Sequence, residues 1–136
     1  MNKIILTLVL SLLSLPIFAE VVVIAHPSNG DTFDRKEIEN IYLGKSRTFP
    51  SGAAVLPLNL DNSVPAREAF DSKVLNKTST QIKSYWAQKV FTGKGTPPKE
   101  VGSVAEMLEL VAANPSIIGY VDSSDATDAV KVIGKF

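Results

Sequence analysis

Cysteine is absent from the 136 residues, so the fold cannot depend on disulfide bonds, and the chain has neither a thiol nucleophile nor the cysteine of a lipoprotein. Histidine occurs once, as His26, which leaves too few nitrogen ligands for a typical zinc site and a single base for any serine triad. No calcium-binding loop follows the acidic pair Asp122 and Asp125. We therefore expect no enzyme, no metal site and no cofactor.

An excess of charge of one sign is also lacking. The chain has 14 basic and 14 acidic residues, and the basic residues form no stripe. A nucleic acid is therefore not expected as a partner, because its phosphates require a concentrated positive surface. A small anion held by a few local groups remains compatible with this balance.

A long apolar run occurs only at the start of the chain. Lys3 precedes the apolar run Ile4–Leu15. Pro16 then breaks the helix, and Ala19 offers a small residue to the signal peptidase. The alternative, a membrane anchor, would need roughly 20 apolar residues, and this run is shorter. We expect cleavage after Ala19, export to the periplasm and no stable membrane anchor afterwards.

The expected organisation is a signal peptide over residues 1–19 and a single domain over residues 20–136. Loss of the leader removes Lys3, which leaves 13 basic against 14 acidic residues and a net charge of −1. A domain of this length can bury a hydrophobic core without disulfides or a metal ion.

Apolar residues recur with periods that predict strands and helices in alternation. Strands are predicted at Val21–Ala25, Val55–Leu60, Ile117–Val121 and Ala129–Ile133. Helix starts are predicted at the capping residues Asp34, Ser63, Thr78 or Ser79, and Ser103. This order favours an α/β domain of three layers, with a mixed or mostly parallel sheet and helices on both faces. Pro57 predicts that its strand lies at an edge of the sheet or pairs irregularly.

The clearest candidate site is the turn that joins the second strand to its helix. Asp61, Asn62 and Ser63 lie at the carboxyl end of that strand, where the free N–H groups of a helix start attract anions. Arg67 follows one helical turn later and could add a fork of donors. A second interpretation stays open: Ser63 could serve only as a helix cap, and Arg67 could pair only with Glu68, Asp71 or another surface carboxylate.

Two other turns contain residues of related chemistry. Ser28 and Asn29 follow the first strand and could face the same crevice, or they could form an ordinary surface turn. His26 at the end of that strand is either functional or hydrogen-bonded for structure. The loop Thr92–Thr96 contains Gly-Lys-Gly, but it lacks the spacing of a phosphate loop and follows a predicted helix, so no site is assigned to it.

Several short motifs in a fixed order resemble one known family. They are Ile41–Lys45, Gly52, the helix with Arg67 and Phe70, Tyr85-Trp86, Phe91-x-Gly93, Pro97-Pro98 and Ile117–Val121. With this order and spacing, nearly all of residues 20–136 resembles the phosphate-binding proteins of bacterial ABC importers. The resemblance implies the type II periplasmic binding fold, in which two lobes close over a ligand.

The chain departs from that family in two respects. It is long enough for one lobe and resembles the second, so a ligand would stay open to water unless a dimer rebuilt the cleft. The family's Ser-Gly-Thr run, preceded by arginine and an acidic residue, corresponds here to Val64–Ala66, with Ser63 one position early. The counterparts that the resemblance implies are Arg67, Ser63 and either Asp61 or Asn62.

The residues and the resemblance together lead to an expectation of function. We expect a periplasmic, non-catalytic solute-binding protein for phosphate or a related oxyanion, associated with ABC-type phosphate uptake or sensing. The expected ligand-binding residues are Ser63, Arg67, Asn62, Asp61 and Ser28. The alternative is a module that has lost ligand binding and contacts a sensor, another envelope protein or a second copy of the chain.

Overall fold

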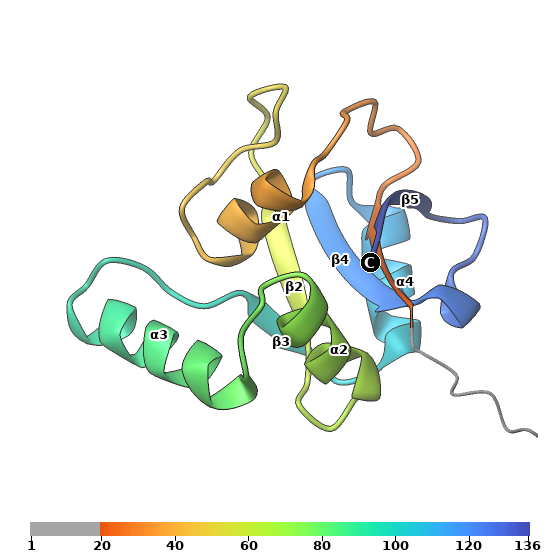
Figure 1. Ribbon diagram of the computed structural model, residues 1–136. Helices are drawn as coiled ribbons and strands as arrows, with labels where there is room; N and C mark the ends of the chain where they lie inside the picture. Colours follow the sequence, from red (N-terminus) through yellow and green to blue (C-terminus); the bar gives the residue numbers. More distant parts are fainter. Residues whose placement is uncertain (1–19) are drawn as a thin grey trace, which may run out of the picture.

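The elements below come from a computed structural model that describes residues 20–136, so the predicted leader lies outside the described residues. The strands are β1 (Val21–Ala25), β2 (Leu56–Leu60), β3 (Lys99–Val101), β4 (Ile117–Asp122) and β5 (Lys131–Lys135). The helices are α1 (Arg35–Tyr42), α2 (Pro65–Lys73), α3 (Ser79–Phe91) and α4 (Val104–Ala113), and a 3-10 turn, η1 (Ser123–Asp125), follows β4 (Figure 1).

The strands form one mixed sheet in the order β3-β2-β4-β1-β5. β2 is parallel to β3 and β4, whereas β1 is antiparallel to β4 and β5. The predicted α/β class with a mixed sheet is therefore confirmed. The register also fixes the strand ends: Ala25 at the carboxyl end of β1 pairs with Ile118 near the amino end of β4. The carboxyl ends of β1 and β2 consequently lie at opposite ends of the sheet.

Pro57 belongs to β2, which is an inner strand of the sheet, but the residue itself is paired on one side only. β2 pairs with β4 through Leu56 and Pro57, and with β3 from Leu58 to Leu60. The strand changes its partner after the proline, whose nitrogen carries no hydrogen for a ladder. The predicted irregular pairing is confirmed, and the alternative of an edge position is wrong.

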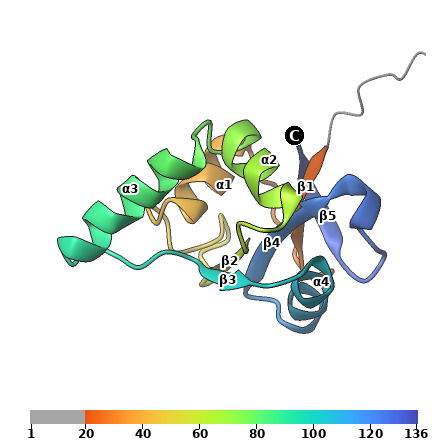
Figure 2. The same ribbon diagram turned by 90° about the horizontal axis from the view of Figure 1, so that it is seen from below.

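Helices cover both faces of the sheet, as predicted (Figure 2). A side chain on Gly119 of β4 would meet Met107 and Val111 of α4. The next residue, Tyr120, points the other way and stacks on Phe70 of α2, with ring centroids 3.9 Å apart. An edge-on aromatic contact joins α1 to α2 on that same face. The core therefore has α4 on one side of the sheet and α1 with α2 on the other.

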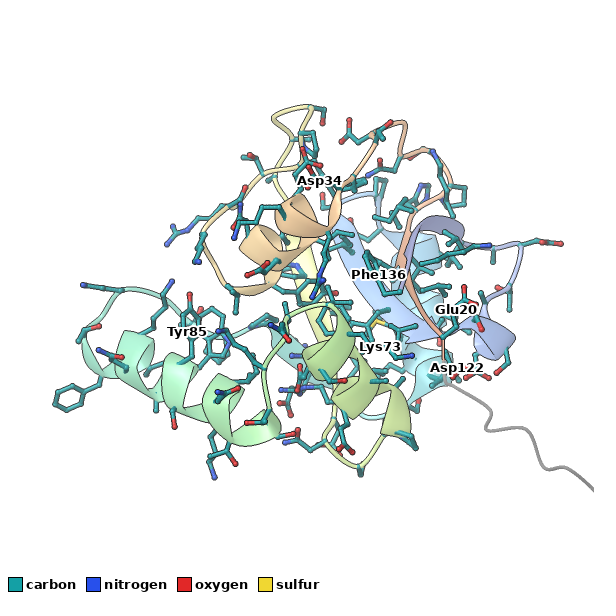
Figure 3. All side chains as sticks on the ribbon, in the orientation of Figure 1. Glu20, Asp34, Lys73, Tyr85, Asp122 and Phe136 are labelled. Carbon is teal, nitrogen blue, oxygen red and sulfur yellow. The ribbon has the colours of Figure 1, made fainter. Side chains whose placement is uncertain are left out.

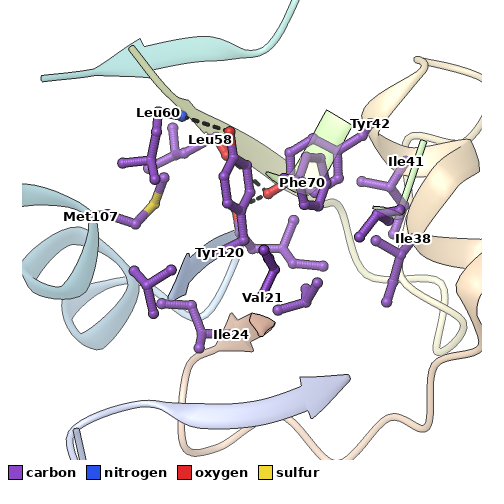
Figure 4. Packing of buried hydrophobic residues seen from close by; sticks show 14 of the residues in the cluster. Val21, Ile24, Ile38, Ile41, Tyr42, Leu58, Leu60, Phe70, Met107 and Tyr120 are labelled. Carbon is purple, nitrogen blue, oxygen red and sulfur yellow. Dashed lines mark hydrogen bonds between the residues drawn. The ribbon is translucent and has the colours of Figure 1, made fainter. Parts of the chain in front are cut away.

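Aromatic residues at the centre of the core fix the carboxyl end of β2 (Figure 4). Phe70 contacts the rings of both Tyr120 and Tyr42. The Tyr120 hydroxyl accepts a hydrogen bond from the Leu60 N–H at 3.1 Å and donates one to the Asn59 side chain. Burial raises the pKa of Tyr120, so this hydroxyl keeps its proton. The turn that follows β2 thus starts from a rigid support.

Side-chain caps set the start of three helices. The capping residues are Asp34 for α1, Thr78 for α3 and Ser103 for α4, each accepting a hydrogen bond from the backbone N–H three residues further on. These predicted starts are confirmed, with Thr78 rather than Ser79 as the cap of α3. The predicted cap of α2 is wrong: the N-cap is Val64, without a side-chain cap, because the Ser63 hydroxyl is bonded to Asp61 instead.

α3 projects beyond β3, at the side of the sheet farthest from β5 (Figures 1 and 2). Its attachment is to the end of α1. The hydroxyl of Tyr85, which is labelled in Figure 3, donates to the Leu43 carbonyl at 2.6 Å. Lys89 Nζ donates to the same oxygen at 3.1 Å. Gly44 follows with a φ of 72°, and a Cβ there would lie 2.9 Å from the Trp86 ring. Glycine is therefore required for this close approach of α1 to α3.

One strand was not predicted, and three others differ from the predicted bounds: β2 begins one residue later, β4 ends one residue later, and β5 is shifted by two residues. β3 was not predicted, because a run of three residues after two prolines carries no readable period. β5 begins at Lys131 instead of Ala129, because a turn closed by the Val130 N–H and the Thr127 carbonyl precedes it. Among residues 20–136, no helix has the length and apolar character needed to span a bilayer.

Candidate functional site

A cavity of about 390 Å³ lies at the carboxyl ends of β2 and β3. It is bounded by the turn after β2, by α2, by the first turns of α3 and by the segment before β3. Its polar lining residues are Asn59, Asn62, Arg67, Ser79, Thr80, Lys83 and Glu100. Two of the predicted residues, Asn62 and Arg67, are therefore brought together, whereas Asp61 and Ser63 belong to the same turn but do not line the cavity.

Arg67 is only 7% exposed, and three hydrogen bonds hold its guanidinium. Nε donates to Oδ2 of Asp71 at 3.1 Å. Nη1 donates to the Leu60 carbonyl at 2.8 Å and to the Glu100 carboxylate at 3.1 Å. The predicted pairing of Arg67 with a carboxylate thus occurs. Within residues 20–136, no hydrogen bond is made by Nη2, the third nitrogen of the guanidinium.

Asp71 accepts the hydrogen bond from Arg67 Nε and does not itself line the cavity. The residue is 1% exposed, and its Oδ1 has no hydrogen-bond partner among the described residues. Burial raises the pKa of Asp71, and the charge of Arg67 offsets only part of that effect. The pair consequently fixes the direction of the guanidinium rather than leaving it free to rotate.

Within the turn after β2, side chains of the turn itself already occupy several hydrogen-bonding groups. Asp61 Oδ2 accepts hydrogen bonds from the Ser63 hydroxyl and, at 3.2 Å, from the Ser63 N–H. These bonds lower the pKa of Asp61, which keeps its carboxylate ionised. Pro65 then removes a further donor at the start of α2. This helix start therefore offers an anion fewer donors than the sequence indicated.

The start of α3 supplies donors that the sequence analysis missed. Ser79 and Thr80 are the first two residues of α3, and both line the cavity. Lys83 adds an ammonium group one helical turn later. The Thr78 side chain accepts a hydrogen bond from the N–H of Gln81. The N–H groups of Ser79 and Thr80, which precede it in the first turn, remain available to a ligand. The helix start was predicted, but no sequence signal places it beside the end of β2, since α2 separates the two segments.

Together these groups form a donor set suited to an oxyanion. Arg67 and Lys83 carry positive charge, and the only carboxylate in the lining, Glu100, is already bonded to Arg67. Hydroxyl and amide donors at the start of α3 complete the set. Among residues 20–136, no group of three or more His, Cys, Asp or Glu side chains could hold a metal ion.

Ser28 lies at the other end of the sheet. It follows Ala25, the carboxyl end of β1, and β1 runs antiparallel to β4, which is parallel to β2. The Ser28 N–H donates to Nδ1 of His26 at 3.1 Å, and the Ser28 hydroxyl lies 2.7 Å from that nitrogen. The expectation that Ser28 shares a crevice with the turn after β2 is therefore wrong, and His26 is hydrogen-bonded within its own turn.

The fold is similar to that of solved phosphate-transport proteins. An ABC-type phosphate transport receptor from Vibrio cholerae matches with a TM-score of 0.66 and 18% identity, over 85% of this chain and 46% of that one. A protein from Clostridium perfringens, described as a phosphate ABC transporter substrate-binding protein with bound phosphate, matches with a TM-score of 0.67 and 19% identity, over 85% and 45%. PstS from Borrelia burgdorferi matches with a TM-score of 0.63 and 18% identity, over 85% and 47%.

No protein-family model and no curated protein matches the sequence. The chain spans about half the length of the three structures, and their low identity bears on fold alone. At that level the resemblance predicted from the motifs is confirmed: the chain has the fold of about half of a phosphate ABC transporter substrate-binding protein.

Proposed function

We propose that the chain is a non-catalytic solute-binding protein that holds phosphate or a related oxyanion in the cavity lined by Arg67 and the start of α3. The observation that carries this proposal is the state of Arg67. Nε and Nη1 are fixed by the fold, while Nη2 is left for a ligand. A donor that is already oriented loses little freedom on binding, which favours recognition of a small anion.

The similar structures support the same ligand class. Two of the three are described as proteins of phosphate transport, and one of these two holds phosphate. On this analogy, the proposed role is in ABC-type phosphate uptake or sensing. Arg67 and Asn62 are the proposed binding residues retained from the sequence, joined by Lys83 and the start of α3.

The proposed place of action is the periplasm. The pattern of residues 1–19 supports cleavage after Ala19 and a single domain from Glu20 onward. A chain of half the length of its structural neighbours provides one wall of a cleft, so a bound anion stays partly exposed to water. A homodimer that joins two such walls would enclose it.

Calorimetric titration of residues 20–136 with phosphate, sulfate and molybdate tests the proposal. We expect saturable heat with at least phosphate. Lys83→Ala should weaken binding about tenfold, because one charge-assisted contact is lost. Lys36→Ala is the matched control, since this exposed lysine of α1 does not line the cavity. Absence of heat and of any thermal shift with all three saturating anions would rule the proposal out.

A second candidate is the interaction module that has lost ligand binding. It is favoured by the same contacts of Arg67, because an arginine bonded to Asp71, Glu100 and a carbonyl already has a structural role. Capture from a periplasmic extract separates the two functions. A stoichiometric envelope partner that Lys83→Ala and Ser63→Ala leave in place, without anion binding in calorimetry, supports the module.

A further inference from the structure

A second and larger cavity, of about 560 Å³, lies between the loop that joins α1 to β2 and the loop that joins α3 to β3. It reaches the amino end of β2 at Leu56 and Pro57, whereas the Arg67 cavity lies at the carboxyl end. Trp86, Pro97 and Pro98 line both cavities and separate them. The other lining residues of the larger cavity differ from those of the Arg67 cavity, so we consider it as a second candidate site.

The lining of this cavity is basic. It contains Arg47, Lys89, Lys94 and Lys99, and it contains no aspartate or glutamate. Arg47, Lys94 and Lys99 are exposed and form no ion pair within residues 20–136. A chain with 14 basic and 14 acidic residues thus gathers four uncompensated cations around one hollow. Such a concentration of charge attracts an anion with more than one negative charge.

Lys89 is held in a fixed position near the carboxyl end of α3. Its Nζ donates to the Leu43 carbonyl at 3.1 Å. It also lies 5.0 Å from the centre of the Tyr85 ring and 5.6 Å from that of Trp86. The carbonyl and the two rings orient the ammonium group without removing its charge, since none of them is anionic.

The loop after α3 adds backbone donors. Gly93 has a φ of 68°, and the N–H groups of Gly93 and Lys94 bond back to carbonyls of α3. The N–H groups of Gly95 and Thr96 make no hydrogen bond to any residue in the described range. Both residues line the cavity, and the prolines that follow restrict the loop. Successive free amides beside a lysine can bind phosphate oxygens although the loop is no Walker-type motif.

The geometry points to a small organic phosphate as the ligand of this cavity: a molecule with at least two negative charges and an apolar or ring-shaped part. The cations and the free amides account for the charge. The edge of Trp86 and the faces of Pro97 and Pro98 account for the apolar part. The volume lies within the range of small-molecule sites, about 300–1,000 Å³, and exceeds what an inorganic anion fills.

The test uses ADP as the probe, with adenosine as the uncharged match. Calorimetry should show saturable binding of ADP and none of adenosine, and the fluorescence of Trp86, the only tryptophan, should change with the same midpoint. Replacing both Lys94 and Lys99 with alanine should weaken ADP binding at least tenfold. Both side chains are exposed, so the variant is expected to fold, which circular dichroism verifies.

Lys83→Ala is the control that separates the two cavities. It should leave ADP binding unchanged, even if phosphate binding at the Arg67 cavity proves absent. The proposal is overturned if ADP gives no saturable signal, or if Lys83→Ala abolishes binding while the Lys94/Lys99 double variant does not. Binding to vesicles of anionic lipid without binding of ADP would likewise overturn it, because the cations would then serve a membrane surface.

Discussion

Arg67 and Asp71 are both buried, and they meet through a hydrogen bond from Nε to Oδ2 of 3.1 Å. The pair illustrates why one arginine can be required for folding and still take part in binding. Nη1 of Arg67 joins α2 to β2 and β3, while Nε is bonded to Asp71 within α2, and these bonds determine where Nη2 lies. Replacing Arg67 would change both the stability of the fold and the affinity for a ligand, so the two effects could not be separated. Lys83 is therefore the better position at which to test the proposed site.

The raised pKa of Asp71 predicts how stability depends on pH. Because burial lifts it above the ordinary value of 3.8, the folded state binds this proton more tightly than the unfolded state. The resulting stabilisation is complete below the unfolded pKa and is lost as the pH rises through the folded pKa. Asp71→Asn stays neutral throughout. We expect the free energy of unfolding of the wild type, relative to the variant, to fall as the pH rises from below 3.8 through the raised pKa of Asp71.

Urea denaturation of both proteins across that range provides the measurement. If the difference in free energy of unfolding stays constant with pH, Arg67 stabilises the carboxylate as much as burial disfavours it. If the difference grows with pH, the effect of Arg67 is the larger one. Either result would contradict the prediction.

The Tyr120 hydroxyl gives a second prediction for a single residue. Tyr120→Phe keeps the stacking on Phe70 but leaves the buried N–H of Leu60 without its acceptor. We expect a loss of about 1–3 kcal/mol in the free energy of unfolding, measured by chemical denaturation. Tyr85→Phe is the control, since the Leu43 carbonyl keeps its bond from Lys89 and should lose less. Equal losses in the two variants would contradict this explanation.

At the scale of elements, the contacts between α3 and the end of α1 bear on both cavities, because Trp86 of α3 lines each of them. A Cβ on Gly44 would come within 2.9 Å of the Trp86 ring, and the residue has a positive φ. Gly52 also has a positive φ, of 92°, but nothing lies within 4 Å of it. Gly52→Ala should cost about 1–2 kcal/mol through backbone strain alone. Gly44→Ala should cost more, because Trp86 must also move.

Trp86 fluorescence and hydrogen exchange of the α3 amides distinguish the two variants. We expect a changed emission and faster exchange in α3 for Gly44→Ala only. The same response in Gly52→Ala would mean that α3 is not held through Gly44.

Elements with local signals were predictable, and contacts between distant elements were not. The caps at Asp34, Thr78 and Ser103 follow from neighbouring residues, so the sequence predicted them. The candidate site was predicted only in part, because its donors at Ser79 and Lys83 come from a helix that the fold brings beside β2. The three residues of β3 were missed because they are too few to show a period.

At the scale of the whole molecule, the proposed phosphate site leads to a prediction about the oligomeric state. The chain covers 45–47% of the three solved structures that it resembles in fold, and under the proposed function two copies would supply the two walls of a ligand cleft. If a homodimer closes the cleft, phosphate should shift the oligomeric equilibrium toward the dimer by mass action. Analytical ultracentrifugation with and without phosphate measures this. An unchanged monomer at saturating phosphate would show that one wall suffices.

The predicted leader can be checked on the same molecule. We expect the protein recovered from the periplasm to begin at Glu20, because the residues before it have the pattern of a signal peptide. Intact-mass analysis of the periplasmic fraction decides the point. A protein that retains residues 1–19 and sediments with membranes would identify an anchor instead.

The most direct test of the proposed binding site is an amide map by NMR of residues 20–136, labelled with ¹⁵N and titrated with phosphate. The fold places free amide donors at the start of α3 and brings Asn62, from the turn after β2, into the same cavity lining. We predict saturable shifts of the Ser79, Thr80 and Asn62 amides, and none around Ser28. Phosphate shifts confined to other parts of the chain, or no shifts at saturating phosphate, would contradict the site.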